Sequence, residues 1–261
     1  MPPPSPRQIL DVAINAAHAA GRRTLAYFNT RGLAVEDKPD ATPVTIADRE
    51  AEQVCREAIL RYFPSHAIKG EEGDDHAGDD RFTWIIDPID GTKSFIHGVP
   101  LYGTLVACLV DGRPSVGVIY LPALDDLIAA ADGEGCFWNG RRTRCSDVAR
   151  IEDATILAGS VTRAIDRSGA FRDLADRCKL NRGWGDAFGY ALVATGRAEA
   201  MLDPKISPWD CAAMPPIFRE AGGWAGNWDG GEDIYGPDWV ACAPGVKAEV
   251  LETLARHETG S

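Results

Sequence analysis

The sequence predicts an α+β N-terminal half followed by an α/β C-terminal half. Two helical patterns open the chain, and apolar segments separated by turn residues follow them as far as residue 131, which is typical of an antiparallel sheet. Beyond Ser146 the pattern changes to alternating strands and helices. Because no low-complexity linker intervenes, we expect two domains, 1–149 and 150–261, that meet at a packing seam.

Two amphipathic helices are predicted first. Ser5 and Pro6 are a favourable N-cap and first-turn pair, and apolar residues then recur at helical spacing toward Phe28. After a turn-rich stretch at 39–43, a second helical pattern occupies 47–62, and the proline that follows ends it.

An acidic loop and a series of strands are expected next. We interpret 74–80 as a solvated loop, because runs of like charge are more often solvated than bound to a metal. Residues 82–86 are rich in β-formers and predict a buried strand. Three further segments, separated by Asp-Gly and proline turns, predict an antiparallel meander at 102–110, 116–120 and 127–131.

The C-terminal half is predicted to alternate short strands with helices. Strands are expected at 154–158 and 199–202. Helices are expected at 171–178, 186–195, 209–221 and 246–257. Glycines that follow the second and third of these helices mark their ends.

Composition excludes several classes of protein. At 261 residues, with 45% hydrophobic and 25% charged residues, the chain has the make-up of an ordinary globular protein. The net charge of −12 argues against a nucleic-acid-binding protein, which needs lysines and arginines to neutralise phosphates. No stretch approaches the roughly 18 apolar residues of a membrane helix, and the first residues lack the apolar core of a signal peptide. We therefore expect a cytoplasmic protein that binds neither nucleic acid nor membrane.

The cysteines and histidines argue against disulfides and zinc. The seven cysteines are an odd number without a Cys-x-x-Cys pair, and several lie within apolar segments, so a reducing compartment is expected. The five histidines show no zinc-ligand spacing. Binding of a hard cation by oxygen ligands remains open.

The strand predicted at 82–86 runs directly into the hexapeptide Asp87-Pro88-Ile89-Asp90-Gly91-Thr92. Two carboxylates three residues apart at the carboxyl end of a strand can face one point, where α/β proteins collect ligands. The proline stiffens the turn, and the glycine lets the backbone approach an anion. A tight surface turn would explain a bare Asp-Gly pair, but the complete hexapeptide favours a functional site.

Four motifs, one of which contains this hexapeptide, form a pattern that spans essentially the whole chain. The motifs are Gly-Glu-Glu at 70–72, Trp-Ile-Ile-Asp-Pro-Ile-Asp-Gly-Thr at 84–92, Trp-Asp at 209–210 and Ala-Gly-Gly at 221–223. In order and spacing, from Thr45 and Asp48 onward, the chain resembles the inositol monophosphatase superfamily. The resemblance implies a layered αβαβα sandwich whose two halves meet at a metal site.

The resemblance also implies a Mg²⁺-dependent hydrolase of small phosphate monoesters, with two or three ions per site. The implied Mg²⁺ ligands are Glu71, Asp87, the Ile89 carbonyl, Asp90 and Asp210. Together with Glu71, Thr92 and Asp48 would orient or activate the attacking water, and Gly91 and Thr92 would bind the phosphate. Glu72 is left open between a supporting role and that of a solvated neighbour.

The mechanism that the resemblance implies is an in-line displacement by water. Mg²⁺ would lower the pKa of the water, neutralise the phosphate oxygens and stabilise the leaving alkoxide. A covalent phosphoaspartate requires Asp-x-Asp-x-Thr, whereas the acids here are spaced Asp-x-x-Asp, so it is not expected. A non-catalytic relative that only binds Mg²⁺ or a phosphorylated ligand is the alternative from another class, and the intact set of ligands argues against it.

Residues 185–192 resemble the histidinol-phosphate phosphatase branch of the superfamily, in which an aspartate at the position of Asp186 helps to recognise the substrate amine. Alternatively, Asp186 could simply N-cap the following helix. Lys93, expected to bind phosphate, stands where arginine is usual in this branch. Ser160 and Asp203 match positions that contact the alcohol portion of the substrate, although each could be a turn residue.

The predicted activity is therefore hydrolysis of histidinol phosphate, a step of histidine biosynthesis. Inositol monophosphate, or another small sugar or nucleotide phosphate, is the alternative substrate. The resemblance further implies a homodimer.

Overall fold

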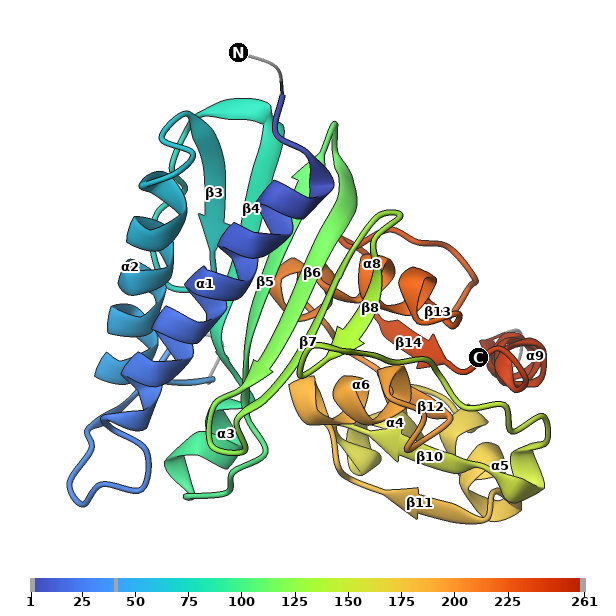
Figure 1. The fold of residues 1–261 in the computed structure, drawn as a ribbon. Helices are drawn as coiled ribbons and strands as arrows, with labels where there is room; N and C mark the ends of the chain where they lie inside the picture. The colour runs from blue at the N-terminus through green and yellow to red at the C-terminus, as the bar shows by residue number, and fades with distance from the viewer. Residues whose placement is uncertain (1–2, 40–41, 259–261) are drawn as a thin grey trace.

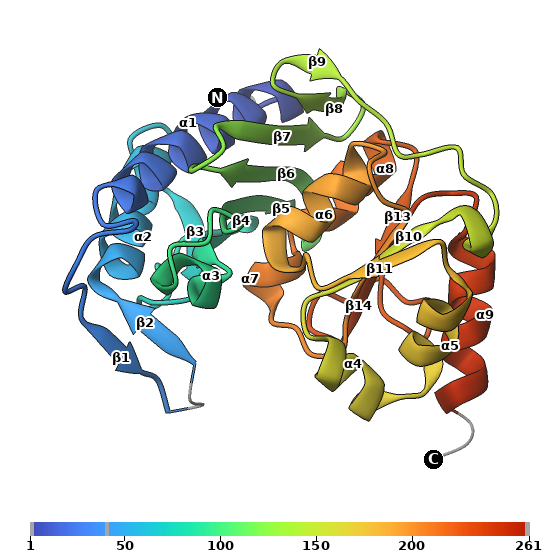
Figure 2. The same cartoon turned by 90° about the horizontal axis from the view of Figure 1, so that it is seen from below.

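The computed structural model describes residues 3–39 and 42–258, which form alternating layers of helices and sheets (Figures 1 and 2). Helices α1 (Pro6–Leu25) and α2 (Ile46–Leu60) cover the outer face of a large sheet. The layer between this sheet and a smaller one contains α6 (Asp186–Ala194) and α8 (Met214–Glu220). The outermost layer on the other side contains α4 (Val161–Arg167), α5 (Ala170–Arg177) and α9 (Lys247–Glu258). The predicted αβαβα sandwich is thus confirmed.

The larger sheet has seven strands in the order β3-β4-β5-β6-β7-β8-β9. Their bounds are β3 His66–Gly70, β4 Asp79–Asp90, β5 Gly103–Val110, β6 Arg113–Leu121, β7 Asp126–Ala131, β8 Gly135–Trp138 and β9 Arg141–Arg142. β3 runs parallel to β4, and every later pair is antiparallel, as the predicted meander requires. β8 and β9, which the sequence did not predict, extend this meander.

The smaller sheet has five strands in the order β11-β10-β12-β14-β13. Their bounds are β10 Thr155–Ala158, β11 Leu180–Arg182, β12 Ala200–Asp203, β13 Trp224–Gly226 and β14 Trp239–Cys242. β10 pairs in parallel with β11 and β12, whereas β14 is antiparallel to β12 and β13. The C-terminal half therefore has a mixed sheet, and its strands β11, β13 and β14 were not predicted.

Short elements connect these layers. They are the hairpin of β1 (Val35–Asp37) and β2 (Pro43–Thr45), the helices α3 (Thr92–Ile96) and α7 (Pro208–Cys211), and the 3₁₀ helix η1 (Ile151–Asp153). α3 and α7 matter for function, because each begins next to one of the acidic motifs.

The N-terminal helices begin where the sequence predicts. Ser5 caps α1 and forms a reciprocal capping box with Gln8, and Pro6 occupies the first turn. Thr45 caps α2 in the same way, with Asp48 as its partner. Each cap satisfies backbone N–H groups that have no partner within the helix.

Two predictions about the course of the chain were wrong. The single helix expected at 209–221 is divided into α7 and α8, because Pro215 and Pro216 in the first turn of α8 lack the N–H groups that would continue an upstream helix. The acidic run at 74–80 is not entirely loop: His76 bridges to Ile68, and Asp79 and Asp80 begin β4.

The larger sheet is buried on both faces. Trp84, Ile86 and Val106 pack against α1 and α2, while Ile85 and Leu105 point the other way into a core shared with the C-terminal half. Because side chains of a strand alternate between faces, continuous apolar strands are what a sheet covered on both sides requires. The division into domains at residue 149 stays a prediction.

None of the helices in the described part of the chain combines the length and hydropathy of a bilayer-spanning segment. All seven cysteines are free thiols.

Candidate active site

The site is built at the carboxyl end of β4. Asp87 and Asp90 are 1% and 8% exposed and pair with Leu105 and Gly103 of β5, with an irregular register between them. Such a bulge turns neighbouring side chains out of strict alternation. Asp210 approaches from α7, and one carboxylate oxygen from each of the three aspartates lies within 4.8 Å of the others. The structure thus brings together three of the predicted metal ligands, two from the end of β4 and one from α7.

The turn after Asp87 is held by local hydrogen bonds. The Ile89 N–H donates to Asp87 Oδ1 at 2.9 Å, and the Thr92 hydroxyl donates to the Ile89 carbonyl at 3.0 Å. Gly91 has φ +85°, a left-handed conformation that strains other residues, and it precedes the first residue of α3. The Ile89 carbonyl and the Thr92 hydroxyl, two predicted site groups, are therefore in direct contact.

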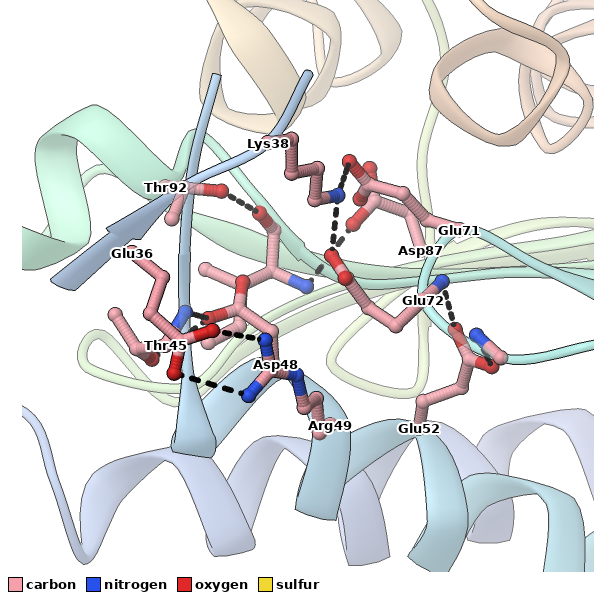
Figure 3. A network of polar contacts seen from close by, with 12 residues as sticks. Glu36, Lys38, Thr45, Asp48, Arg49, Glu52, Glu71, Glu72, Asp87 and Thr92 are labelled. Atoms are coloured by element: carbon pink, nitrogen blue, oxygen red, sulfur yellow. Dashed lines mark hydrogen bonds and ion pairs between the residues drawn. The ribbon is translucent and has the colours of Figure 1, made fainter. Parts of the chain in front are cut away.

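Glu71 lies in the turn that follows β3, and its carboxylate contacts the ammonium group of Lys38 (Figure 3). Lys38 Nζ lies 2.8 Å from Glu71 Oε1 and 2.6 Å from Glu72 Oε1. Burial opposes the charge of Lys38, but these two hydrogen bonds prevail and raise its pKa. The Glu72 side chain is only 7% exposed, so it is not a freely solvated neighbour. Sequence reasoning missed Lys38, because no motif links it to glutamates more than 30 residues away.

Asp48 is fully buried at the start of α2. Its Oδ2 accepts hydrogen bonds from the Thr45 N–H at 2.8 Å and from the Thr45 hydroxyl at 2.7 Å. Its Oδ1 is also buried and has no hydrogen-bond partner in the described structure. Asp48 therefore serves as a capping residue and keeps one oxygen free to accept a further hydrogen bond.

Burial and mutual repulsion disfavour the ionised form of each aspartate in the cluster. Burial, followed by repulsion from Glu71, raises the pKa of Asp87 well above its usual range, and burial followed by the charge of Asp186 does the same for Asp90. Burial raises the pKa of Asp210 to about 6. Carboxylates crowded in a region of low dielectric hold their protons unless a cation compensates them.

The cluster fits a hard divalent cation. Its donors are all carboxylate oxygens, and Asp90 Oδ2 is buried with no hydrogen-bond partner among the described residues. A buried oxygen without a partner is costly, and coordination of a cation removes that cost. Mg²⁺ prefers oxygen ligands of this kind.

The structure argues against the capping interpretation of Asp186. The N-cap of α6 is Gly185, and Asp186 is the first residue of the helix, so it is not the cap. Asp186 has φ +53°, which is rare for a residue other than glycine, and its Oδ2 would lie 3.0 Å from a Cβ atom at Gly91. Burial raises its pKa to about 6. A strained backbone thus holds this carboxylate against the turn at Gly91.

Asp203 and Ser160 line a cavity that Asp186 also lines. Asp203 Oδ2 accepts a hydrogen bond from the Tyr190 hydroxyl at 2.6 Å, and burial raises the pKa of Asp203 to about 7. Ser160 is the N-cap of α4, and its hydroxyl accepts from the Arg163 N–H at 3.4 Å. Tyr190, which sequence reasoning also missed, therefore orients Asp203.

Two adjoining cavities connect these groups. The larger, of about 460 Å³, is lined by Glu71, Asp87, Ile89, Asp90, Gly91, Thr92, Lys93, Asp186 and Asp210 among others. The smaller, of about 300 Å³, is lined by Ser160 and Asp203. Both share a wall formed by Lys93, Arg163, Asp186 and Lys205. The predicted metal and phosphate residues therefore share one cavity, the predicted contacts to the alcohol lie in the other, and Asp48 lies outside both linings.

Comparison with known proteins gives close relatives over nearly the whole chain. The chain is 45% identical to a histidinol-phosphatase of Chlorobaculum parvum over 90% of its own length and 91% of the relative. It is 38% identical to a histidinol-phosphatase of Mycobacterium tuberculosis over 94% of its length and 97% of the relative. The solved structure of an IMPase of Thermotoga maritima matches with a TM-score of 0.87 at 31% identity, covering 95% and 97% of the two chains.

The fold, the acidic site and these relatives define a phosphoric monoester hydrolase. The profile of the inositol monophosphatase family matches residues 5–259. The chain belongs to the inositol monophosphatase family, as its motifs predicted.

Proposed function

We propose that this chain is a Mg²⁺-dependent histidinol-phosphate phosphatase, which converts L-histidinol phosphate and water into L-histidinol and phosphate. The observation that carries the choice of substrate is the Asp186 carboxylate, which lies beside Gly91 in the wall common to the two cavities. A phosphate bound in the larger cavity would leave the rest of the molecule beside this carboxylate. The two relatives named histidinol-phosphatase support the same choice.

Glu71, Asp87, the Ile89 carbonyl, Asp90 and Asp210 would hold the Mg²⁺ ions. When bound, Mg²⁺ supplies the positive charge that neutralises the phosphate and stabilises the leaving alkoxide. The partnerless oxygen of Asp90 and the crowding of three aspartates support this assignment.

The remaining roles belong to the chain's own groups. The left-handed turn at Gly91 would present backbone N–H groups to the phosphate, and Lys93, which lines the cavity, would add a point charge. Thr92, fixed by its bond to the Ile89 carbonyl, would orient the attacking water together with Glu71. Asp48 would accept a hydrogen bond from this network through its free oxygen.

Asp186 would accept the substrate ammonium, which a neutral alcohol such as inositol lacks. Charge-assisted hydrogen bonds between ammonium and carboxylate are stronger than neutral ones, so the pairing discriminates between the two esters. Asp203, oriented by Tyr190, and Ser160 would contact the alcohol portion in the smaller cavity.

The test compares wild type with Asp186→Asn on histidinol phosphate and on inositol 1-phosphate. Asparagine adopts left-handed backbone conformations more readily than most residues, so this variant removes the charge and keeps the turn. We expect KM for histidinol phosphate to rise roughly 10–100-fold, while KM for inositol 1-phosphate changes less than about 3-fold. Asp166→Asn, on the exposed side of α4, is the matched control. Equal changes for both esters would remove Asp186 from substrate recognition and favour a neutral substrate.

We further propose that the protein is a cytoplasmic homodimer, on the strength of its family resemblance. Light scattering coupled to gel filtration would test the dimer: a mass close to 28.1 kDa would contradict it, and twice that mass is expected.

A further inference from the structure

Helix α2 carries a line of charged side chains on the face that meets the turn after β3. Asp48, Glu52 and Arg56 follow one another at intervals of four residues, which places them on one face of the helix. Glu52 is a carboxylate whose side chain is only 3% exposed. None of the activities discussed above uses it.

Glu52 binds the backbone of the neighbouring turn with both of its oxygens (Figure 3). Its Oε2 accepts from the Glu72 N–H at 2.8 Å, and its Oε1 accepts from the Gly73 N–H at 2.9 Å. Arg56 Nε donates to the same Oε1 at 2.8 Å. Both oxygens are therefore engaged, and the negative charge is balanced by an arginine that is itself fixed on α2.

The two glycines that flank the turn are explained by this contact. A Cβ atom at Gly70 would lie 2.3 Å from Glu52 Oε1, and a Cβ atom at Gly73 would lie 2.9 Å from the same oxygen. Neither glycine has a left-handed φ, so the backbone conformation does not require glycine. The Gly-Glu-Glu-Gly sequence at 70–73 is what allows the turn to close around a buried carboxylate.

Glu71 lies in a turn whose backbone is held by hydrogen bonds at Glu71 itself and at the two residues that follow. Its N–H donates to the Ile86 carbonyl of β4 at 3.3 Å, and the next two N–H groups donate to Glu52. With the backbone fixed on both sides, the Glu71 side chain is directed toward Lys38 and Asp87 (Figure 3). Asp48 sits one helical turn before Glu52, so α2 sets the position of Glu71 relative to Asp48.

We infer that Glu52 is a positioning residue for the reaction: it holds the turn at 70–73 so that Glu71 and Asp48 keep the arrangement that metal binding and water orientation require. This inference rests on the proposed function, because it needs Glu71 to be a Mg²⁺ ligand. A buried carboxylate is expensive to desolvate, and its hydrogen bonds to backbone N–H groups give it a directional role that an apolar side chain could not fill.

The test uses Glu52→Gln, with Glu57→Gln as the matched control. Glutamine keeps the size of the side chain, but its NH₂ group cannot accept the second N–H and faces Arg56 without attraction. Glu57 is an exposed residue of the same helix, and its carboxylate accepts a hydrogen bond from the Gln53 side chain. In metal-free protein, we expect faster amide hydrogen exchange at Glu72 and Gly73 for Glu52→Gln and no change for Glu57→Gln.

The second readout is Mg²⁺ binding by calorimetry. Changing the partners that orient a metal ligand typically weakens metal affinity or activity 10–100-fold, so a loss of roughly that size is expected for Glu52→Gln. KM for histidinol phosphate at saturating Mg²⁺ should change less than about 3-fold, which a general loss of structure would not produce. If Glu52→Gln fails to fold, Gly70→Ala takes its place, because the added methyl displaces the same carboxylate.

Glu71→Gln, measured alongside, separates two kinds of failure. If Glu71→Gln weakens Mg²⁺ binding and Glu52→Gln does not, the inference about Glu52 is overturned and the proposed function stands. If Glu71→Gln leaves Mg²⁺ binding at the wild-type level, the proposed role of Glu71 fails, and the inference fails with it. Faster exchange combined with weaker binding in Glu52→Gln supports the inference.

Discussion

Two groups of carboxylates meet at the site where Glu71 contacts Asp87, and among the described residues only one group has an ion-pair partner. Glu71 and Glu72 share the ammonium of Lys38 at 2.8 and 2.6 Å. Asp87, Asp90 and Asp210 each place one carboxylate oxygen within 4.8 Å of the others, yet the described structure gives them no ion pair with a lysine or arginine, and Asp90 Oδ2 has no hydrogen-bond partner there. Lys38 therefore offsets the charge of the glutamates within the chain, whereas the described residues supply no counter-ion to the aspartates.

The largest expected effect is on activity. Asp90→Asn removes a charge from the group without a cation, and we expect kcat at saturating Mg²⁺ to fall roughly 10³-fold, because charge stabilisation by the cation is lost. Steady-state kinetics on histidinol phosphate would measure it, with exposed Asp166→Asn as the control. A loss smaller than about 10-fold would mean that the aspartate group does not hold the catalytic cation.

The next effect is a pH-dependent stability of the metal-free protein. Burial raises the pKa of Asp210 to about 6, above its unfolded value of about 3.9, so the native state binds the proton more tightly. Stability should therefore fall as pH rises from about 4 to 6 and stay low above that range. At pH 7, Asp210→Asn should raise the unfolding free energy by roughly 1–3 kcal/mol. Urea unfolding in EDTA at pH 4 and pH 7 would measure it.

The contradicting result for Asp210 would be equal stability of variant and wild type at pH 7. Asparagine retains the oxygen that accepts the Ser207 N–H, so loss of the capping bond does not confuse the comparison. Adding Mg²⁺ should reverse the order, because the cation stabilises only the wild-type cluster.

Lys38→Met removes the cation that Glu71 and Glu72 share. Removal of the ammonium leaves Glu71 and Glu72 partly buried without a counter-ion, and we expect a loss of roughly 1–3 kcal/mol of stability in EDTA. Mg²⁺ should restore more stability to this variant than to wild type, as thermal unfolding with and without Mg²⁺ would show. If Lys38→Met is as stable as wild type in EDTA, the ion pairs of Lys38 with the two glutamates do not contribute to the free energy of unfolding.

The smallest expected effect concerns Tyr190. Tyr190→Phe removes the donor to Asp203 Oδ2 and leaves the ring in place, so KM for histidinol phosphate should rise about 5-fold, as the loss of about 1 kcal/mol predicts, with kcat little changed. Initial-rate kinetics measure both constants. An unchanged KM would mean that Asp203 does not need this partner to meet the substrate.

The sequence predicted those parts of the fold that local rules determine. The cap at Ser5 and the buried strand at 82–86 are properties of neighbouring residues, and each appeared as expected. The break between α7 and α8 was missed although Pro215 and Pro216 are visible in the sequence, because the apolar pattern continues across them. Strand β14 has only four residues, too few for a periodic pattern to stand out.

In the candidate site, too, the contacts between neighbouring residues could be predicted, and those between distant residues could not. Asp87, Asp90 and Thr92 lie in one hexapeptide, so their proximity follows from a single turn. The contacts of Lys38 with Glu71 and of Glu52 with Gly73 join residues 33 and 21 positions apart, and they arise from the packing of the β1–β2 hairpin and α2 against the turn. The left-handed backbone of Asp186 is likewise a tertiary effect, since nothing in its neighbouring residues indicates it.

In the proposed function, a cation bound by the aspartates promotes hydrolysis, and the Asp186 carboxylate selects an amine-bearing phosphate ester. The most direct measurement is phosphate release from histidinol phosphate and from inositol 1-phosphate, side by side, in Mg²⁺ and in excess EDTA. We predict release that requires Mg²⁺ and a kcat/KM at least about 10-fold higher for histidinol phosphate. Release that continues in EDTA would contradict the dependence on Mg²⁺, and a preference for inositol 1-phosphate would contradict the proposed substrate.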